Sequence, residues 1–323
     1  MKPSKKGFTL IELLVVVAII ALLISILLPS LSRARELSKR LVCGSNVKGM
    51  GTAFKIYANE NEEQWPTPPF CDETGTFITY NFEPSGTLQV GKPTGTTVGA
   101  TPGREAMSTV CSTVTGAPAG TTTLSVTRAL WMLVRSGDVT PKQFACPSSG
   151  DTADPEQNLD TYYDFTAYKN ISYGYQVPFG PLDTRPSENI DTRLATAADK
   201  GVYSHDPIGS LPSPGDPHPT DMTKWSPQDW KEYNSPNHGG WTTGEGQNVL
   251  FGDGHSSFEK KPICGVDDDN IYTRMDGSQT GTDFLYGRYI GLVPGAADDY
   301  PGYQGLQVDS VTKDSNTDSL IYP

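Results

Sequence analysis

The chain has 323 residues, of which 33 are Gly and 26 are Pro, and its formal net charge is −12. This length allows one large or two modest folded units, and the Gly and Pro content predicts many loops. The acidic balance argues against direct binding of nucleic acid, because such binding needs basic surfaces that meet phosphates.

A basic leader precedes a long apolar segment at the N-terminus. Lys2, Lys5 and Lys6 are followed by an apolar run over residues 8–28, in which Glu12 is the one acid. As a helix this run is about 32 Å long, enough to cross a bilayer core of about 30 Å. The lysines predict a cytoplasmic N-terminus and export of the rest of the chain. We therefore expect a single-pass membrane protein whose globular part is exported.

Two simpler interpretations of this segment fit less well. A cleaved signal peptide has a shorter apolar core and an Ala-x-Ala-like site, whereas residues 26–33 here read Ile-Leu-Leu-Pro-Ser-Leu-Ser-Arg. A plain membrane anchor fits the length, but a charge at bilayer depth costs roughly 2.5 kcal/mol or more. Glu12 therefore indicates a partner or a function.

Residues 7–12, Gly-Phe-Thr-Leu-Ile-Glu, resemble the leader of type IV pilins and type II secretion pseudopilins. The resemblance implies cleavage after Gly7 by a prepilin peptidase and N-methylation of the new terminus, Phe8. It also implies that Glu12 pairs with the terminal amine of a neighbouring subunit and sets the axial register of a filament. An unpaired charge inside an apolar helix bundle would be costly. Pro29 stands where pilins often carry a helix-kinking proline, so a kink is expected there.

An amphipathic continuation of the helix is predicted over residues 29–59. Apolar residues recur in two sets at helical spacing. They are Leu31, Ala34, Leu37 and Leu41, and then Val47, Met50, Phe54 and Tyr57. Gly44, Gly49 and Gly51 weaken the helix by up to about 1 kcal/mol each. We therefore expect a break near residues 43–46.

Residues 60–323 are predicted to form a β-rich globular domain. The expected fold class is α+β, with a long N-terminal helix, transmembrane and then amphipathic, packed on an antiparallel sheet with large loop insertions. The expected elements are strands over 77–80 and 171–177, a helix over 128–136, an irregular insertion over 86–123 and a loop over 204–227.

Five cysteines are present: Cys43, Cys71, Cys111, Cys146 and Cys264. Export permits disulfides, but the odd number leaves at least one thiol free or joined between chains. For Cys43, on the predicted helix, burial as a small apolar residue and participation in a bridge are both open. The connectivity of the others is not readable from the sequence.

Residues 248–258 predict a β-hairpin with a type I′ turn at Asp253 and Gly254. The segment resembles the C-terminal motif of a large bacterial group of pilin-like proteins, in which a His precedes Asp-Gly by nine residues. In this chain fourteen residues separate His238 from Asp253. Residues 241–247 account for the excess as a loop expansion.

Catalysis is not expected from this sequence. His238, Asp253 and His255 lack a third ligand or a nucleophile in a known catalytic string, and no P-loop, G-x-S-x-G or H-E-x-x-H is present. We interpret His238 as a structural hydrogen-bonding residue beside a turn.

No cofactor is expected, and calcium is the one metal that the sequence favours. Asp267 and Asp269 lie in the run Asp-Asp-Asp-Asn at 267–270, and Asp276 and Asp283 follow. Such hard oxygen donors in a turn-rich region suit calcium. A solvated acidic loop is the alternative interpretation.

These features predict a structural subunit of a type IV pilus-like or type II secretion pseudopilus filament. Its partners would be prepilin peptidase, other pilin or pseudopilin subunits and the inner membrane. The alternative is a membrane-anchored envelope binding protein that never polymerises, in which exposed aromatic residues such as Trp225, Trp230 and Trp241 bind carbohydrate.

Overall fold

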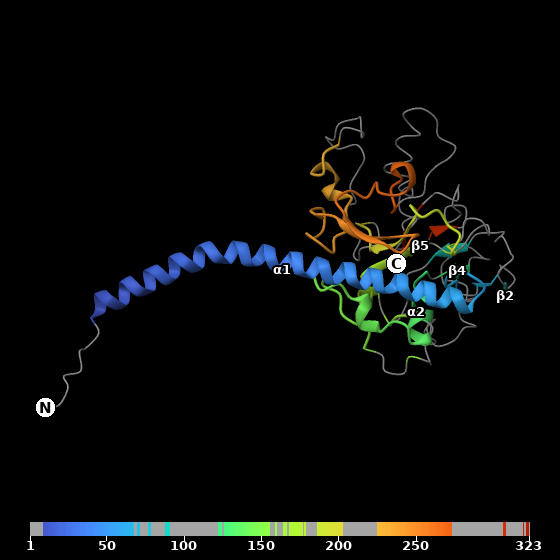
Figure 1. Cartoon of the computed structure of the whole chain (residues 1–323), viewed down its shortest axis with the longest axis horizontal. Helices are drawn as coiled ribbons and strands as arrows, with labels where there is room; N and C mark the ends of the chain where they lie inside the picture. Colours follow the sequence, from blue (N-terminus) through green and yellow to red (C-terminus); the bar gives the residue numbers. More distant parts are fainter. Residues whose placement is uncertain are drawn as a thin grey trace.

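A long helix with a β-rich head on its C-terminal half makes up the described part of the chain (Figure 1). The computed structural model describes residues 9–67, 70–71, 77–78, 88–90, 122–124, 126–155, 159, 164–166, 168–176, 178, 186–202, 225–272, 306–307, 319 and 321–322.

The helix α1 (Leu10–Glu60) runs without interruption for 51 residues. It continues through Pro29, and Figure 1 shows the helix as gently curved over its length. The predicted break near residues 43–46 is wrong. Cys43, Val47 and Met50 are fully buried in this stretch, and burial of such side chains, at about 1.5–3 kcal/mol each, offsets the weak helix propensity of the glycines.

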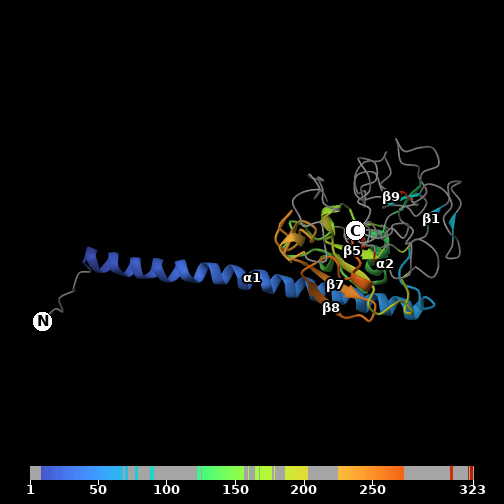
Figure 2. The same ribbon diagram turned by 90° about the horizontal axis from the view of Figure 1, so that it is seen from above.

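The head covers only the second half of α1, as two perpendicular views show (Figures 1 and 2). Every residue from Leu10 to Arg35 is exposed, and Glu36 is the first that the head partly covers. The predicted apolar stripe is therefore buried only in its second set. Members of the first set stay exposed, namely Leu31, Ala34, Leu37 and Leu41.

The main sheet is antiparallel and has the strand order β10-β5-β6-β7-β8. Its strands are β5 (Tyr173–Gln176), β6 (Ala195–Asp199), β7 (Gln247–Phe251), β8 (Ser256–Glu259) and β10 (Ile321–Tyr322). The helix α2 (Thr127–Ser136) confirms the helix predicted over 128–136. The α+β prediction is confirmed, with α1 packed against β6, β7 and β8.

Two smaller sheets and four short 3-10 helices complete the described elements. β1 (Phe70–Cys71) pairs antiparallel with β2 (Phe77–Ile78), and residues 79–80 of the strand predicted over 77–80 lie outside the described residues. β3 (Leu88–Val90) lies between β4 (Thr122–Leu124) and β9 (Leu306–Gln307). β3 falls inside the insertion predicted to be irregular, and residues 91–121 of that insertion lie outside the described residues. The short helices are η2 (Pro141–Phe144), η4 (Tyr168–Asn170), η8 (Asp229–Glu232) and η9 (Val266–Asp268).

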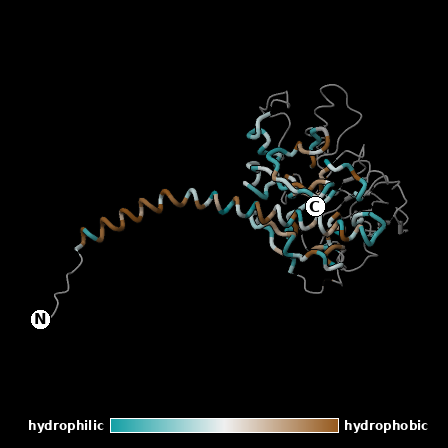
Figure 3. Tube along the Cα trace, in the orientation of Figure 1, coloured by the Kyte–Doolittle hydropathy of each residue, from teal (hydrophilic) through white to brown (hydrophobic). Residues whose placement is uncertain are grey.

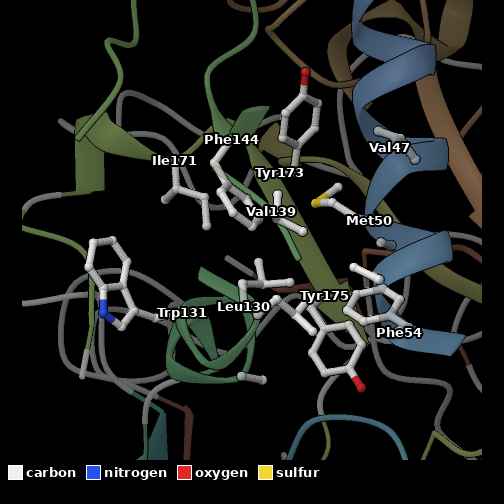
Figure 4. Packing of buried hydrophobic residues seen from close by; sticks show 14 of the residues in the cluster. Val47, Met50, Phe54, Leu130, Trp131, Val139, Phe144, Ile171, Tyr173 and Tyr175 are labelled. Atoms are coloured by element: carbon white, nitrogen blue, oxygen red, sulfur yellow. The ribbon is translucent and has the colours of Figure 1, made fainter. Parts of the chain in front are cut away.

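The main core lies between α1, α2 and one face of the five-stranded sheet (Figure 4). Met50 and Phe54 of α1 face Tyr173 and Tyr175 of β5, and Leu130 of α2 closes the other side. The ring centroids of Phe54 and Tyr175 are 4.8 Å apart. This packing fixes the docked half of α1 on the sheet.

A second core covers the opposite face of the sheet. Trp230 and Tyr233 pack there against Val249 and Phe251 of β7, while Leu250 points to the main core. The alternation follows from the two-residue period of a strand. Because both faces are covered, all five residues of β7 are buried.

Candidate functional site

The N-terminal end of α1 is capped by hydrogen bonds between Thr9 and Glu12. The Glu12 carboxylate accepts hydrogen bonds from the backbone N–H of Thr9 at 2.8 Å and from its hydroxyl at 2.7 Å. The Glu12 N–H donates in return to Oγ1 of Thr9 at 3.3 Å. This is a capping box, which satisfies backbone donors at the helix start. Gly7 and Phe8, the predicted processing residues, lie outside the described residues.

The first half of α1 is apolar and uncovered, as Figure 3 shows along the helix. By length and composition this stretch is sufficient to cross a membrane. Two of its hydroxyls are satisfied locally, because those of Ser25 and Ser30 donate to the carbonyls of Leu22 and Leu27. Pro29 contributes no backbone N–H, and such positions commonly bend helices.

Where α1 meets the head, five polar side chains form what we call the junction cluster: Glu36 and Cys43 of α1, Cys146 after η2, Asp199 at the end of β6, and His238 before β7. His238 lies at the centre. Its Nδ1 is 3.1 Å from Oε1 of Glu36, and its Nε2 is 3.4 Å from Oδ2 of Asp199 and 3.9 Å from Sγ of Cys146. The sulfurs of Cys43 and Cys146 are 2.6 Å apart. All members except Glu36 are buried.

Amide groups hold Asp199 inside the head. Its Oδ2 accepts from the backbone N–H of Asn248 at 2.6 Å and from that residue's side-chain amide at 3.0 Å. Its Oδ1 accepts from the amide of Asn237 at 3.0 Å. A buried carboxylate is tolerated only with such donors and a countercharge. His238 supplies the countercharge.

In the junction cluster a positive charge on His238 lies between the negative charges of two carboxylates. Burial alone would lower the pKa of His238, but effects led by the hydrogen bond to Asp199, and including the charge of that carboxylate, outweigh it and raise the pKa to about 10. Burial works to raise the pKa of Glu36, yet its bonds to His238 and Ser148 and the charge of Arg40 lower it overall. A cationic His238 therefore stands between the carboxylates of Glu36 and Asp199.

Arg40 makes a second bridge one helical turn further along α1. Its guanidinium pairs with Glu245 in the expanded loop before β7 and approaches Glu36 at 3.8 Å. It also lies over the Phe258 ring, 4.7 Å from the centroid. The loop that separates His238 from the hairpin thus contributes a contact to the helix.

The predicted hairpin is confirmed, because β7 and β8 pair antiparallel. The type I′ assignment is wrong. In the turn only Gly254 has a positive φ, of 86°. The Gly254 N–H donates to the carbonyl of Phe251 at 2.8 Å, and the Phe251 N–H donates to that of His255 at 3.0 Å. This is the three-residue loop that a left-handed glycine closes.

His238 and Asp253 do not share a site. His238 is buried beneath α1, whereas the Asp253 side chain is 45% exposed and binds the ring Nδ1 of His255 at 2.5 Å. A Cβ on Gly254 would approach the Lys55 side chain, about 18 Å further along α1 than Cys43. His238 and Gly254 therefore lie near opposite ends of the docked half of the helix.

Comparisons with known proteins concern mainly the N-terminal segment. The prokaryotic N-terminal methylation motif matches residues 2–28. The type IV major pilin protein PilA of Myxococcus xanthus (strain DK1622) is 40% identical over 73 residues. In its N-terminal segment the chain is a type IV pilin-like protein. The match spans 23% of this chain and 32% of that pilin. A comparison with solved structures gives no match.

The exposed apolar half of α1 and the methylation motif together make this pilin-like chain a membrane-anchored protein. The anchor and the junction cluster lie on the same helix.

Three members of the junction cluster contact one another in the order of a catalytic triad. Cys146 would be the nucleophile, His238 the base and Asp199 the acid that orients the base. A nucleophilic cysteine needs a lowered pKa and access to substrate. Contact with Cys43 and burial instead raise the pKa of the Cys146 thiol, and the side chain is 1% exposed. This arrangement does not suit a reacting thiolate.

Four members of the junction cluster carry metal-ligating atoms that all lie within 4.8 Å of one another: Cys43, Cys146, Asp199 and His238. Two Cys, a His and a carboxylate are ligand types that zinc accepts. Sequence reasoning missed this convergence, because the four residues come from separate segments with no metal-site spacing.

The acidic loop proposed for calcium is described only in part. Asp269 is buried, and its Oδ2 accepts the backbone N–H of Ser319 at 2.8 Å. Asp276 and Asp283 lie outside the described residues, as does the side chain of Asp267. Calcium binding at Asp267 and Asp269 stays a prediction.

The tryptophans proposed to face a carbohydrate are mostly inside the head. Trp225 and Trp230 are buried, with ring centroids 4.7 Å apart, and they pack on Tyr233. Trp241 is half-buried against the same core. The expectation that Trp225 and Trp230 are exposed is therefore wrong.

Proposed function

We propose that this pilin-like chain is a structural subunit of a type IV pilus-like or type II secretion pseudopilus filament, rather than an enzyme. The supporting observation is the apolar surface of α1 beyond the length of a membrane span. Residues 8–28 suffice for a bilayer, yet Leu31, Leu37 and Leu41 follow them and are 48%, 60% and 70% exposed. A plain anchor does not need these residues, whereas a helix that packs on neighbouring helices does.

The N-terminus supports the same proposal. Prepilin peptidase would cut after Gly7, and the amine of Phe8 would be methylated. The new terminus would lie two residues from the helix start at Leu10, where Glu12 is bonded only to Thr9 among the described residues. In a helix bundle the carboxylate of one subunit then meets the amine of the next, because neither charge is stable alone in apolar surroundings.

The proposed orientation places Lys2, Lys5 and Lys6 in the cytoplasm and the head in the periplasm or at the surface. Loss of these three lysines with the leader changes the formal charge from −12 to −15 (−12 − 3). The partners would be prepilin peptidase, other subunits and the inner membrane. An acidic head is not expected to bind nucleic acid directly.

Glu12→Ala tests the proposal, with Thr9→Ala as the matched control that removes the capping box but keeps the carboxylate. We expect Glu12→Ala to keep normal amounts of subunit in the membrane and to lower the sheared filament fraction at least tenfold. Thr9→Ala should assemble nearly as well as the wild type. Mass spectrometry of the mature protein should find N-methylated Phe8 as its first residue. An intact leader in mature protein, or full assembly by Glu12→Ala, would contradict the proposal and leave a non-polymerising anchored protein.

A further inference from the structure

We propose that Cys43 and Cys146 form a disulfide that fastens α1 to the head where the helix leaves it. Their sulfurs are 2.6 Å apart, and both side chains are buried. Heavy atoms that share no bond pack at about 3.5–4.0 Å, so two free thiols do not fit this position. The remaining choices are a covalent bond between the sulfurs and a metal ion that both bind.

The surrounding contacts disfavour the metal. Two thiolates on a tetrahedral zinc, each about 2.3 Å from it, are about 3.7 Å apart, which is further from the observed 2.6 Å than the length of a disulfide bond, about 2.05 Å. Asp199 would have to be a ligand, but its Oδ2 already accepts two hydrogen bonds from Asn248 and its Oδ1 accepts one from Asn237. His238 is placed for ion pairing, with one ring nitrogen near Glu36 and the other near Asp199. The cluster is complete without an ion.

The position of the pair explains what the bond does. Cys43 is the first buried residue of α1, and the helix N-terminal to it extends away from the head (Figure 1). Glu36 and Arg40 also contact the head N-terminal to it, through His238 and Glu245, so Cys43 lies within the first turns of the docked half. Cys146 follows η2 in a different segment of the head, 103 residues away in sequence. A covalent bond between them prevents this part of α1 from separating from the head.

The bond forms by ordinary thiol–disulfide exchange. The two thiols give up two protons and two electrons, and the disulfide of an envelope thiol oxidase accepts them and leaves as two thiols. Both sulfurs are buried in the folded head, so the exchange takes place before α1 is fully docked. The supply of oxidant rests on the proposed export of the head.

Peptide mapping tests the pairing directly. The full chain is extracted in detergent from its native membrane, denatured with iodoacetamide in the absence of reductant, and digested with trypsin. The five cysteines fall in five different tryptic peptides, with Cys43 in 41–48 and Cys146 in 143–169. We expect one species whose mass is the sum of these two peptides less two hydrogens and which disappears on reduction. Zinc is measured on the same preparation and should be far below one equivalent.

A melting experiment supplies the matched control. Reduction should lower the Tm of the wild type by roughly 10 °C, and Cys264→Ser should keep this shift. Cys43→Ser should have no reduction-dependent shift. If the 41–48 and 143–169 peptides are alkylated and the protein holds one equivalent of zinc, the two cysteines form a metal site and not a disulfide. If they are alkylated and no zinc is found, both the disulfide and the metal site are refuted.

The outcome is independent of filament assembly. A cross-linked pair in a protein that never polymerises would refute the proposed function and leave the disulfide standing. If the chain stays in the cytoplasm, treatment with oxidised glutathione replaces the missing oxidant, and failure to cross-link under those conditions would overturn the inference.

Discussion

Nδ1 of His238 lies 3.1 Å from Oε1 of Glu36, a contact that joins the loop before β7 to α1 across 202 residues of sequence. Ser148 donates its hydroxyl to the same oxygen at 2.9 Å. Glu36 is also the first residue of α1 that the head partly covers. His238 therefore binds the helix at its exit from the head.

Asp199→Asn should lower the free energy of unfolding by about 3–5 kcal/mol. The substitution removes the buried anion beside His238 and places an amide where Asn248 and Asn237 now donate to a carboxylate. Urea unfolding in detergent, followed by tryptophan fluorescence, measures the loss. Asp253→Asn is the control, because that carboxylate is in an exposed turn and should cost less than about 1 kcal/mol. Equal losses in the two variants would contradict a special role for Asp199.

Gly51→Leu should lower stability by at least about 1–3 kcal/mol. A Cβ at this position would lie only 2.7 Å from Cδ1 of Leu250, which is buried in the main core. The glycine lets α1 approach β7 closely. Thr52→Leu is the matched control, because Thr52 follows Gly51 in α1 and is exposed, and this variant should change the Tm little. If the two variants have the same Tm, the close approach of α1 to β7 does not require a glycine.

Local patterns predicted the elements whose signals are contained in one segment. The apolar run gave α1, the spacing of Leu130, Trp131, Leu133 and Val134 gave α2, and Asp-Gly gave the hairpin. The capping box of Thr9 and Glu12 is also a local pattern, Thr-x-x-Glu. The resemblance to pilins predicts only an intersubunit role for the charge of Glu12, whereas the structure also gives this side chain a role at the helix start.

Contacts between distant segments were not predictable from the sequence. Gly44 and Gly51 indicated a break in α1, but they face Asn248 and Leu250 of β7, and this packing keeps the helix intact. The junction cluster has the same origin, because the topology of the sheet alone brings Asp199 beside His238. Such effects of tertiary structure override local propensity.

Asp269→Asn should lower the Tm by the same amount with and without calcium. The carboxylate is buried and accepts the backbone N–H of Ser319, so its loss weakens the link between that segment and the loop after η9. Thermal unfolding in millimolar calcium and in excess chelator measures both effects. Asp268→Asn, at an exposed position, is the control. A wild-type Tm that rises with calcium, and a variant Tm that does not, would establish the predicted calcium site instead.

The ion pair of His238 should make stability depend on pH. Its pKa is about 10 in the folded protein, above the ordinary value of 6.5, so folding favours the protonated ring. This stabilisation is complete below pH 6.5 and is lost as the pH rises through about 10. The difference in Tm between the wild type and His238→Gln should therefore be largest below pH 6.5 and shrink toward pH 10. His255→Gln, in the exposed turn, is the control and should give a small difference at every pH. A His238→Gln difference that stays constant over this range would mean that the buried ring is neutral and that Glu36 and Asp199 bind it only through hydrogen bonds.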